Sequence, residues 1–154
     1  AQLYIVGDGP LRAQLEEQAR NLGIAENVVF TRNLDNYSIK ILLNECDMLV
    51  LPSIANSEAF GLVQLEAMAC SKPVINTSLP TGVPYVSLHE QTGLTVPPGD
   101  AIALGKAMQR LIDNDSERIQ MGMRAKARIM GYFNLDSMLD KVFELYHNIL
   151  KTGP

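Results

Sequence analysis

Short runs of apolar residues alternate along this chain with stretches whose apolar side chains recur every three or four residues. The runs fall at residues 3–6, 27–30, 48–52, 73–76 and 93–98. An unbroken apolar run of this length is typical of a strand buried on both faces, as in parallel sheets covered by helices on both sides. We therefore predict an α/β fold with a Rossmann-like parallel sheet of four or five strands and helices on both faces.

Helical periodicity fills the intervals between these runs. It is found at residues 11–23, 35–46, 62–69, 100–112, 116–130 and 135–150. Pro10 is placed to open the first of these helices, and Asp100 is placed to cap the fourth. The intervening segment 77–84 is rich in turn-forming residues, so we expect a loop there. No linker or internal repeat interrupts the sequence, and we expect residues 1–154 to form a single domain.

Charge and cysteine content narrow the class of function. The chain carries 13 Lys and Arg against 17 Asp and Glu, a net charge of −4, which argues against a nucleic-acid partner. Cys46 and Cys70 lie in apolar runs outside any C-x-x-C pair, so we expect reduced thiols and a cytoplasmic protein. Four basic residues lie close together in one stretch, namely Arg118, Arg124, Lys126 and Arg128. Such a stretch usually forms a solvated helix face, and the alternative is peripheral contact with the inner membrane or with a partner domain.

Four segments of unusual chemistry follow predicted strands. They are GDGP at 7–10, TRNLDN at 31–36, PSIANSEAFG at 52–61 and NTSLPTGVP at 76–84. In doubly wound sheets ligands bind beyond the carboxyl ends of the strands. We therefore expect all four segments to reach the same crevice.

The third segment continues as SEAFGLVQLEAMA, in which Glu58 and Glu66 flank a glycine at the start of a predicted helix. A buried carboxylate without a partner is costly, so each should have a partner or face a cavity. Gly61 would let a ligand approach the free amides of the helix N-terminus, where an anion such as phosphate is favoured. An ionised carboxylate only accepts hydrogen bonds, so the two glutamates suit sugar hydroxyls on either side of that phosphate.

These features together predict a site for a nucleotide-diphosphate-sugar. The alternative is a purely structural pair, in which Glu58 caps the helix and Glu66 forms an ion pair with Lys72 or an arginine.

Ordered motifs along the chain resemble a known family. GDGP at 7–10, E-AFGLVQL-E-AMACSKPV at 58–74, TGVP at 81–84 and TGLTVPPGD at 92–100 are similar to the C-terminal, nucleotide-sugar-binding half of the GT-B retaining glycosyltransferases of the family 4 (group 1) type. Glu58 and Glu66 match the E-x7-E signature of that family. The resemblance covers residues 3–100 and, more loosely, the final helices. It implies that an N-terminal domain that binds the acceptor is missing from this chain.

The resemblance implies roles by position. Glu58 would hold hydroxyl groups of the donor hexose and serve catalysis, and Glu66 would bind the ribose diol. The remaining contacts to the sugar and the diphosphate would come from the main-chain amides of Ala59, Phe60, Gly61 and Leu62.

The two earlier segments would also contact the donor in this family. Arg32 and Asn33 match the segment that holds the base, and Gly7 and Gly9 match a turn that passes close to the donor. The family often carries glycine at the positions of Ser71 and Asn33, and a glutamate near Tyr85, so this chain departs from the pattern there.

The implied reaction transfers a hexosyl or N-acetylhexosaminyl group, with retention, to a glycan or lipid-linked acceptor. We expect a UDP-sugar donor, a role in surface polysaccharide or lipopolysaccharide O-antigen biosynthesis, and neither metal nor cofactor. The basic pair that neutralises the diphosphate in the family would precede Ala1, so we expect the chain alone to be inactive. The alternatives are a GT-B epimerase or phosphorylase, and a sugar-nucleotide-binding or interaction module without catalysis.

Two other candidate sites have simpler explanations. Residues 113–115 spell D-x-D, which holds a metal in a different glycosyltransferase fold, but they separate two predicted helices and are expected to form a helix boundary. His89 follows the TGVP motif, and it lies either on the acceptor side or in an exposed loop.

Overall fold

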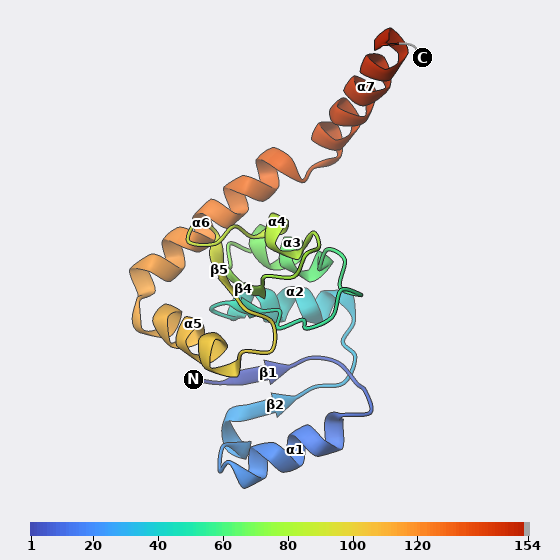
Figure 1. Cartoon of the computed structure of the whole chain (residues 1–154). Helices are drawn as coiled ribbons and strands as arrows, with labels where there is room; N and C mark the ends of the chain where they lie inside the picture. The colour runs from blue at the N-terminus through green and yellow to red at the C-terminus, as the bar shows by residue number, and fades with distance from the viewer. Residues whose placement is uncertain (153–154) are drawn as a thin grey trace. The chain divides into compact units, whose positions relative to one another are not determined.

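Parallel strands alternate with helices in the computed structural model, which describes residues 1–152 (Figure 1). The strands are β1 Leu3–Ile5, β2 Val28–Phe30, β3 Leu49–Val50, β4 Val74–Thr77 and β5 Gly93–Val96. The helices are α1 Arg12–Asn21, α2 Asn36–Glu45, α3 Leu62–Ala69, α4 Val83–Val86, α5 Ala101–Asp113, α6 Asp115–Tyr132 and α7 Leu135–Thr152, with a 3-10 turn η1 at Ala25–Asn27. This order confirms the predicted α/β class. The short helix α4 begins inside the segment 77–84, which was expected to be a loop, and ends two residues beyond it.

The described chain divides into two compact units, residues 1–42 (unit 1) and residues 43–152 (unit 2). In unit 1, β1 and β2 pair in parallel, with Leu3 opposite Val28 and Ile5 opposite Phe30. The prediction of a fully buried first strand is wrong, because Leu3 is 39% and Tyr4 44% exposed. Helix α1 and the 3-10 turn η1 pack against β2, and these two elements leave part of the strand pair uncovered. The start of α2 also belongs to this unit.

Unit 2 contains a three-stranded parallel sheet in the order β3-β4-β5. Every residue of the central strand β4 is buried, as its unbroken apolar start predicts. The core beside it consists of side chains from β4, β5, α5 and α6, namely Ile75, Leu94, Val96, Ala107, Leu111 and Met121. The sequence predicts a single sheet. Among the described strands, hydrogen bonds instead form a two-stranded sheet in unit 1 and a three-stranded sheet in unit 2.

The junction between α5 and α6 accounts for the D-x-D triplet. The Asp100 carboxylate caps α5 by accepting from the Ala103 amide at 2.8 Å, as predicted. At the other end, Asn114 lies between the two helices, and Arg118 pairs with Asp115 at 2.8 Å and donates to the Leu111 carbonyl. Residues 113–115 thus form a helix boundary.

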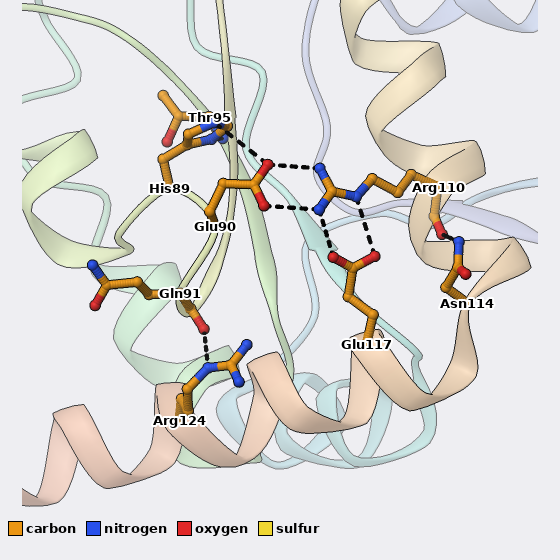
Figure 2. A network of polar contacts seen from close by, with 8 residues as sticks. All are labelled: His89, Glu90, Gln91, Thr95, Arg110, Asn114, Glu117 and Arg124. Carbon is orange, nitrogen blue, oxygen red and sulfur yellow. Dashed lines mark hydrogen bonds and ion pairs between the residues drawn. The ribbon is translucent and has the colours of Figure 1, made fainter.

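A network of charged groups anchors the turn between α4 and β5 to the two following helices (Figure 2). The Arg110 guanidinium donates to both carboxylate oxygens of Glu90, at 2.6 and 2.8 Å, and also to Glu117. Arg124 donates to the Gln91 carbonyl at 2.6 Å. These bonds hold the turn in one position. Within it, Glu90 has a left-handed backbone with φ of 63°, which is unfavourable for a residue other than glycine.

Helix α7 is exposed along its described length. Its apolar side chains include Phe143 at 67% and Leu150 at 82% exposure. Within residues 1–152, no helix combines the length and apolar character needed to cross a membrane.

We expect the variant Glu90→Ala to unfold at a lower temperature than Glu90→Gly. Both variants lose the bonds to Arg110, but only glycine removes the cost of a left-handed backbone. The difference should be about 2–4 °C for a chain of this size, measured by circular dichroism at neutral pH. Equal melting temperatures would show that the turn relaxes out of this conformation once Arg110 is released.

The same ion pair should make stability depend on pH. Hydrogen bonds from Arg110 hold the pKa of Glu90 below its ordinary value of 4.5. A carboxyl with a lowered pKa in the folded state contributes stability above the unfolded value, and that contribution is lost as the pH falls through the folded value. The melting temperature of the wild type should therefore exceed that of Glu90→Gln at pH 7 and converge with it well below pH 4.5. A gap that persists unchanged at pH 3 would contradict this assignment.

Candidate functional site

The main chain of the segment 52–61 is held in place by groups on β4 and α4. Thr77, the last residue of β4, donates its hydroxyl to the Ser53 carbonyl at 2.7 Å. The Gly82 amide, just before α4, donates to the Ala59 carbonyl at 2.8 Å. A side chain at Gly82 would come within 2.7 Å of the Phe60 ring, so the close approach requires glycine. The segment thus enters α3 along a fixed path.

Gly61 forms the N-cap of α3, as the sequence predicts for the start of this helix. Its backbone is left-handed, with φ of 73°. A Cβ atom there would lie 2.6 Å from Leu51 Cδ2 and 2.9 Å from Gln64 Nε2. The left-handed conformation therefore favours glycine, and a side chain here would have to displace Leu51 and Gln64.

Five consecutive main-chain N–H groups, from Ala59 to Val63, donate to no acceptor within residues 1–152. In a trans peptide the N–H and C=O groups point in opposite directions. Because the Ala59 carbonyl is bound to Gly82, the Phe60 N–H is turned away from that contact. Unpaired amides at the positive end of a helix form a binding site for an anion.

The two glutamates flank these amides without partners of their own. Glu58 is half-buried and Glu66 is exposed, and neither side chain forms an ion pair or hydrogen bond in the described part of the chain. The cap position belongs to Gly61, which receives no side-chain bond. Lys72 donates to the Asn44 carbonyl at 2.8 Å. In the purely structural alternative, Glu58 caps α3 and Glu66 pairs with Lys72 or an arginine. Neither contact is present among the described residues, so this alternative is wrong.

Aromatic contacts hold the ring of Phe60, and sequence reasoning missed them. Phe60 packs edge-on against Phe133 at 6.1 Å between ring centroids, and Phe133 packs in the same way against Tyr85 at 5.9 Å. Arg128 lies over the Tyr85 and Phe133 rings and donates to the Tyr85 carbonyl at 2.7 Å. The expectation of a solvated basic face is therefore wrong for Arg128. The sequence contained one signal for this contact. Arg128 lies four residues before Tyr132, and residues at this spacing share one face of a helix.

The remaining predicted site residues lie in unit 1. Gly7 and Gly9 follow β1, and Arg32 and Asn33, both exposed, follow β2. The two strands are parallel, so both segments lie at the carboxyl end of this pair. Arg12 joins them, since its guanidinium donates to the carbonyls of Phe30 and Thr31 at 3.1 and 2.9 Å. The expectation that these segments share one crevice with residues of unit 2 stays a prediction.

His89 is exposed in the turn before β5. Its Nδ1 accepts a hydrogen bond from the Thr95 amide at 2.9 Å, and its Nε2 lies 3.7 Å from Glu90 (Figure 2). Within residues 1–152, no cluster of three or more His, Cys, Asp or Glu side chains is arranged to hold a metal ion.

Comparison with known proteins identifies the family of this site. The sequence model described as glycosyl transferases group 1 matches residues 1–128. The chain belongs to the group 1 glycosyl transferases. This confirms the family that the ordered motifs predict.

Individual relatives are similar along most of this chain. It is 34% identical over 150 residues to the O-antigen chain mannosyltransferase C of Escherichia coli, covering 97% of this chain and 40% of that protein. It is 39% identical over 131 residues to the D-rhamnosyltransferase WbpZ of Pseudomonas aeruginosa, covering 85% and 34%. The crystal structure of Anabaena HepE in complex with UDP-glucose has a TM-score of 0.83 at 25% identity, over 96% of this chain and 41% of that one. The chain thus spans about 40% or less of the length of these relatives.

We expect Arg12→Met to loosen the end of β2 within unit 1. The substitution removes two charge-assisted hydrogen bonds to the carbonyls of Phe30 and Thr31, beside the Thr31 amide that donates to Ile5. Exchange of the Thr31 amide hydrogen should accelerate about 10- to 150-fold, because a charge-assisted hydrogen bond contributes roughly 1.5–3 kcal/mol to local stability. The matched control is Arg20→Met, in the last turn of the same helix and exposed. Equal acceleration in both variants would contradict this role for Arg12.

Proposed function

We propose that this chain binds the donor substrate of a retaining glycosyltransferase, a nucleotide-diphosphate-sugar. The observation that carries the proposal is the run of unpaired amides from Ala59 to Val63, flanked by two carboxylates without partners. The amides and the positive end of α3 suit a diphosphate, which is anionic and accepts hydrogen bonds. The carboxylates suit hydroxyl groups, which donate them. A nucleotide-diphosphate-sugar has hydroxyl groups on both sides of its diphosphate.

The roles of individual residues follow from this arrangement and from the family. Glu58, in the segment before the helix, accepts from hydroxyl groups of the transferred hexose. Glu66, in the second turn of α3, accepts from the ribose diol. The proposal keeps Arg32 and Asn33 for the base, and Gly7 and Gly9 for close passage of the main chain beside the donor. No cofactor or metal takes part in it.

The proposed reaction transfers a hexosyl or N-acetylhexosaminyl group to a hydroxyl of a glycan or lipid-linked acceptor. The bond between the anomeric carbon and the diphosphate oxygen breaks, and the acceptor oxygen attacks from the same face. Its proton passes to the departing phosphate. Negative charge grows on the diphosphate as the bond breaks, and main-chain amides already aimed at it stabilise that charge without reorganisation.

Two relatives support the donor class and the pathway that we propose. HepE of Anabaena was crystallised with UDP-glucose, which supports a UDP-sugar as the first donor to test. The mannosyltransferase of Escherichia coli is named for the O-antigen chain, which supports a role in surface polysaccharide biosynthesis. The proposal adds a location at the cytoplasmic face of the inner membrane. A panel of UDP- and GDP-sugars, titrated against the chain by calorimetry, tests the proposal. Absence of binding by every member of the panel would refute it.

The substitutions Glu58→Gln and Glu66→Gln should differ in which ligand they weaken. Glu66→Gln should weaken UDP and UDP-glucose alike, because the two ligands share the ribose. Glu58→Gln should weaken UDP-glucose and leave UDP nearly unchanged, because only the sugar-bearing ligand reaches it. A charge-assisted hydrogen bond contributes roughly 1.5–3 kcal/mol, so each loss corresponds to a factor of about 10 to 150 in affinity. Calorimetric titration of both ligands against both variants measures the difference.

The control for this pair is Glu144→Gln on the exposed helix α7, which should bind both ligands as the wild type does. Thermal melts show whether the variants remain folded. If Glu58→Gln loses UDP and UDP-glucose equally while its melting temperature is unchanged, the assignment of Glu58 to the hexose is wrong.

A further inference from the structure

Two side-chain amides lie fully buried in unit 2, next to the proposed donor site. Gln64 of α3 and Asn76 of β4 both have 0% exposure. Burial of a polar group is unfavourable unless its hydrogen bonds are made inside the protein. Among the described residues, no buried side-chain nitrogen or oxygen lacks a partner. Apolar residues at positions 64 and 76 would need no hydrogen-bond partners. The presence of two amides there therefore calls for an explanation of what their hydrogen bonds do.

The hydrogen bonds of these amides form a relay with one direction. The Thr95 hydroxyl of β5 donates to Asn76 Oδ1 at 2.7 Å, which turns the Asn76 nitrogen toward α3. Asn76 Nδ2 then donates to Gln64 Oε1 at 2.9 Å. Gln64 Nε2 in turn donates to the Phe60 carbonyl at 2.9 Å. Further bonds from both amides to the Val83 carbonyl fix the relay against α4.

The end of the relay sets the orientation of a single peptide unit. The Phe60 carbonyl and the Gly61 N–H belong to the same trans peptide, so they point in opposite directions. With the carbonyl bound to Gln64 inside the unit, the Gly61 N–H is directed away from it, and it has no acceptor within residues 1–152. The Gln64 amide also occupies the space that a side chain at Gly61 would need.

We propose that Gln64, Asn76 and Thr95 are positioning residues that aim the Gly61 amide at the diphosphate of the donor. This inference rests on the function proposed above, and it adds residues that touch no substrate themselves. They act through the Phe60 carbonyl. Their effect should therefore appear in the orientation of the 60–61 peptide and in donor affinity, beyond any effect on stability.

Three variants separate positioning from structural support. Gln64→Met keeps the length and helical preference of the side chain but removes the donor to Phe60. Thr95→Val removes the hydroxyl that starts the relay. The matched control is Thr92→Val, the same substitution three residues earlier, where the hydroxyl is buried against Ser87 and accepts from the Leu88 amide at 2.7 Å. Thr92 forms no hydrogen bond with the relay amides or with Phe60, although the carbonyl of its partner Ser87 accepts from Asn76 Nδ2 at 3.4 Å.

The first measurement needs no ligand. In spectra of the ¹⁵N-labelled chain, Gln64→Met and Thr95→Val should shift or broaden the amide resonances of Gly61 and Leu62. Thr92→Val should leave them in place although it lowers the melting temperature. An unchanged Gly61 resonance in Gln64→Met would overturn the inference.

The second measurement is calorimetric titration with UDP-glucose. We expect Gln64→Met to weaken binding about 10-fold and Thr95→Val about 3-fold, the range of one neutral hydrogen bond. The double variant should lose little more than Gln64→Met alone, since both act through one carbonyl. If Thr92→Val loses as much affinity for UDP-glucose as Gln64→Met does at a similar loss of melting temperature, the affinity follows stability alone and the proposal is overturned. If the wild-type chain binds no sugar nucleotide, the proposed function fails, and the Gly61 resonance then decides the positioning role alone.

Discussion

The geometry of the proposed donor site depends on where two carbonyl groups are bound. The Ala59 carbonyl accepts from the Gly82 amide, and the Phe60 carbonyl accepts from the Gln64 side chain. Each of these carbonyls fixes the plane of its peptide, and each plane turns the following N–H toward the opposite side. The directions of the unpaired Phe60 and Gly61 amides are therefore a consequence of bonds made by the carbonyls of the same two peptides. The carbonyl oxygens of Ala59 and Phe60 are bound within the protein, and the amide nitrogens of Phe60 and Gly61 remain free to donate to a ligand.

Local signals in the sequence were sufficient to predict most of the elements. Apolar runs located all five strands and periodicity located the long helices, because both signals are carried by neighbours in the chain. Helix α4 was missed because four residues with a proline at the second position do not develop a helical period. The exposure of β1 was also unforeseen, since an apolar run reports a preference for burial and does not show which surface covers it.

The supports of the candidate site were harder to predict than its centre. Gly61, Glu58 and Glu66 lie within nine residues of one another, and their types carry the chemistry directly. Arg128 and Asn76 reach the same region from distant parts of the sequence. Arg128 donates to the main-chain oxygens of Tyr85 and Val86, which leave no trace in the sequence. Asn76 bonds to the side chains of Gln64 and Thr95, which lie 12 and 19 residues away along the chain. One signal was present. Gln64 and Asn76 are polar residues inside apolar runs, and a polar residue at a core position requires a partner.

In the proposed site, main-chain amides bind the diphosphate and side chains contact the sugar, and this division affects which sugar can be chosen. Amides from Ala59 to Val63 offer the same donors whatever side chains they carry, provided that position 61 is glycine, so they can recognise a diphosphate but cannot distinguish one sugar from another. Discrimination must come from side chains beside the amides, of which Glu58 is half-buried and without a partner, and Tyr85 is 57% exposed next to the Phe133 ring. A rigid main-chain site for the diphosphate can thus be combined with variable side chains at positions 58 and 85. Under the proposed function, we expect substitutions at these two positions to alter the choice of sugar without disturbing the relay behind Gly61.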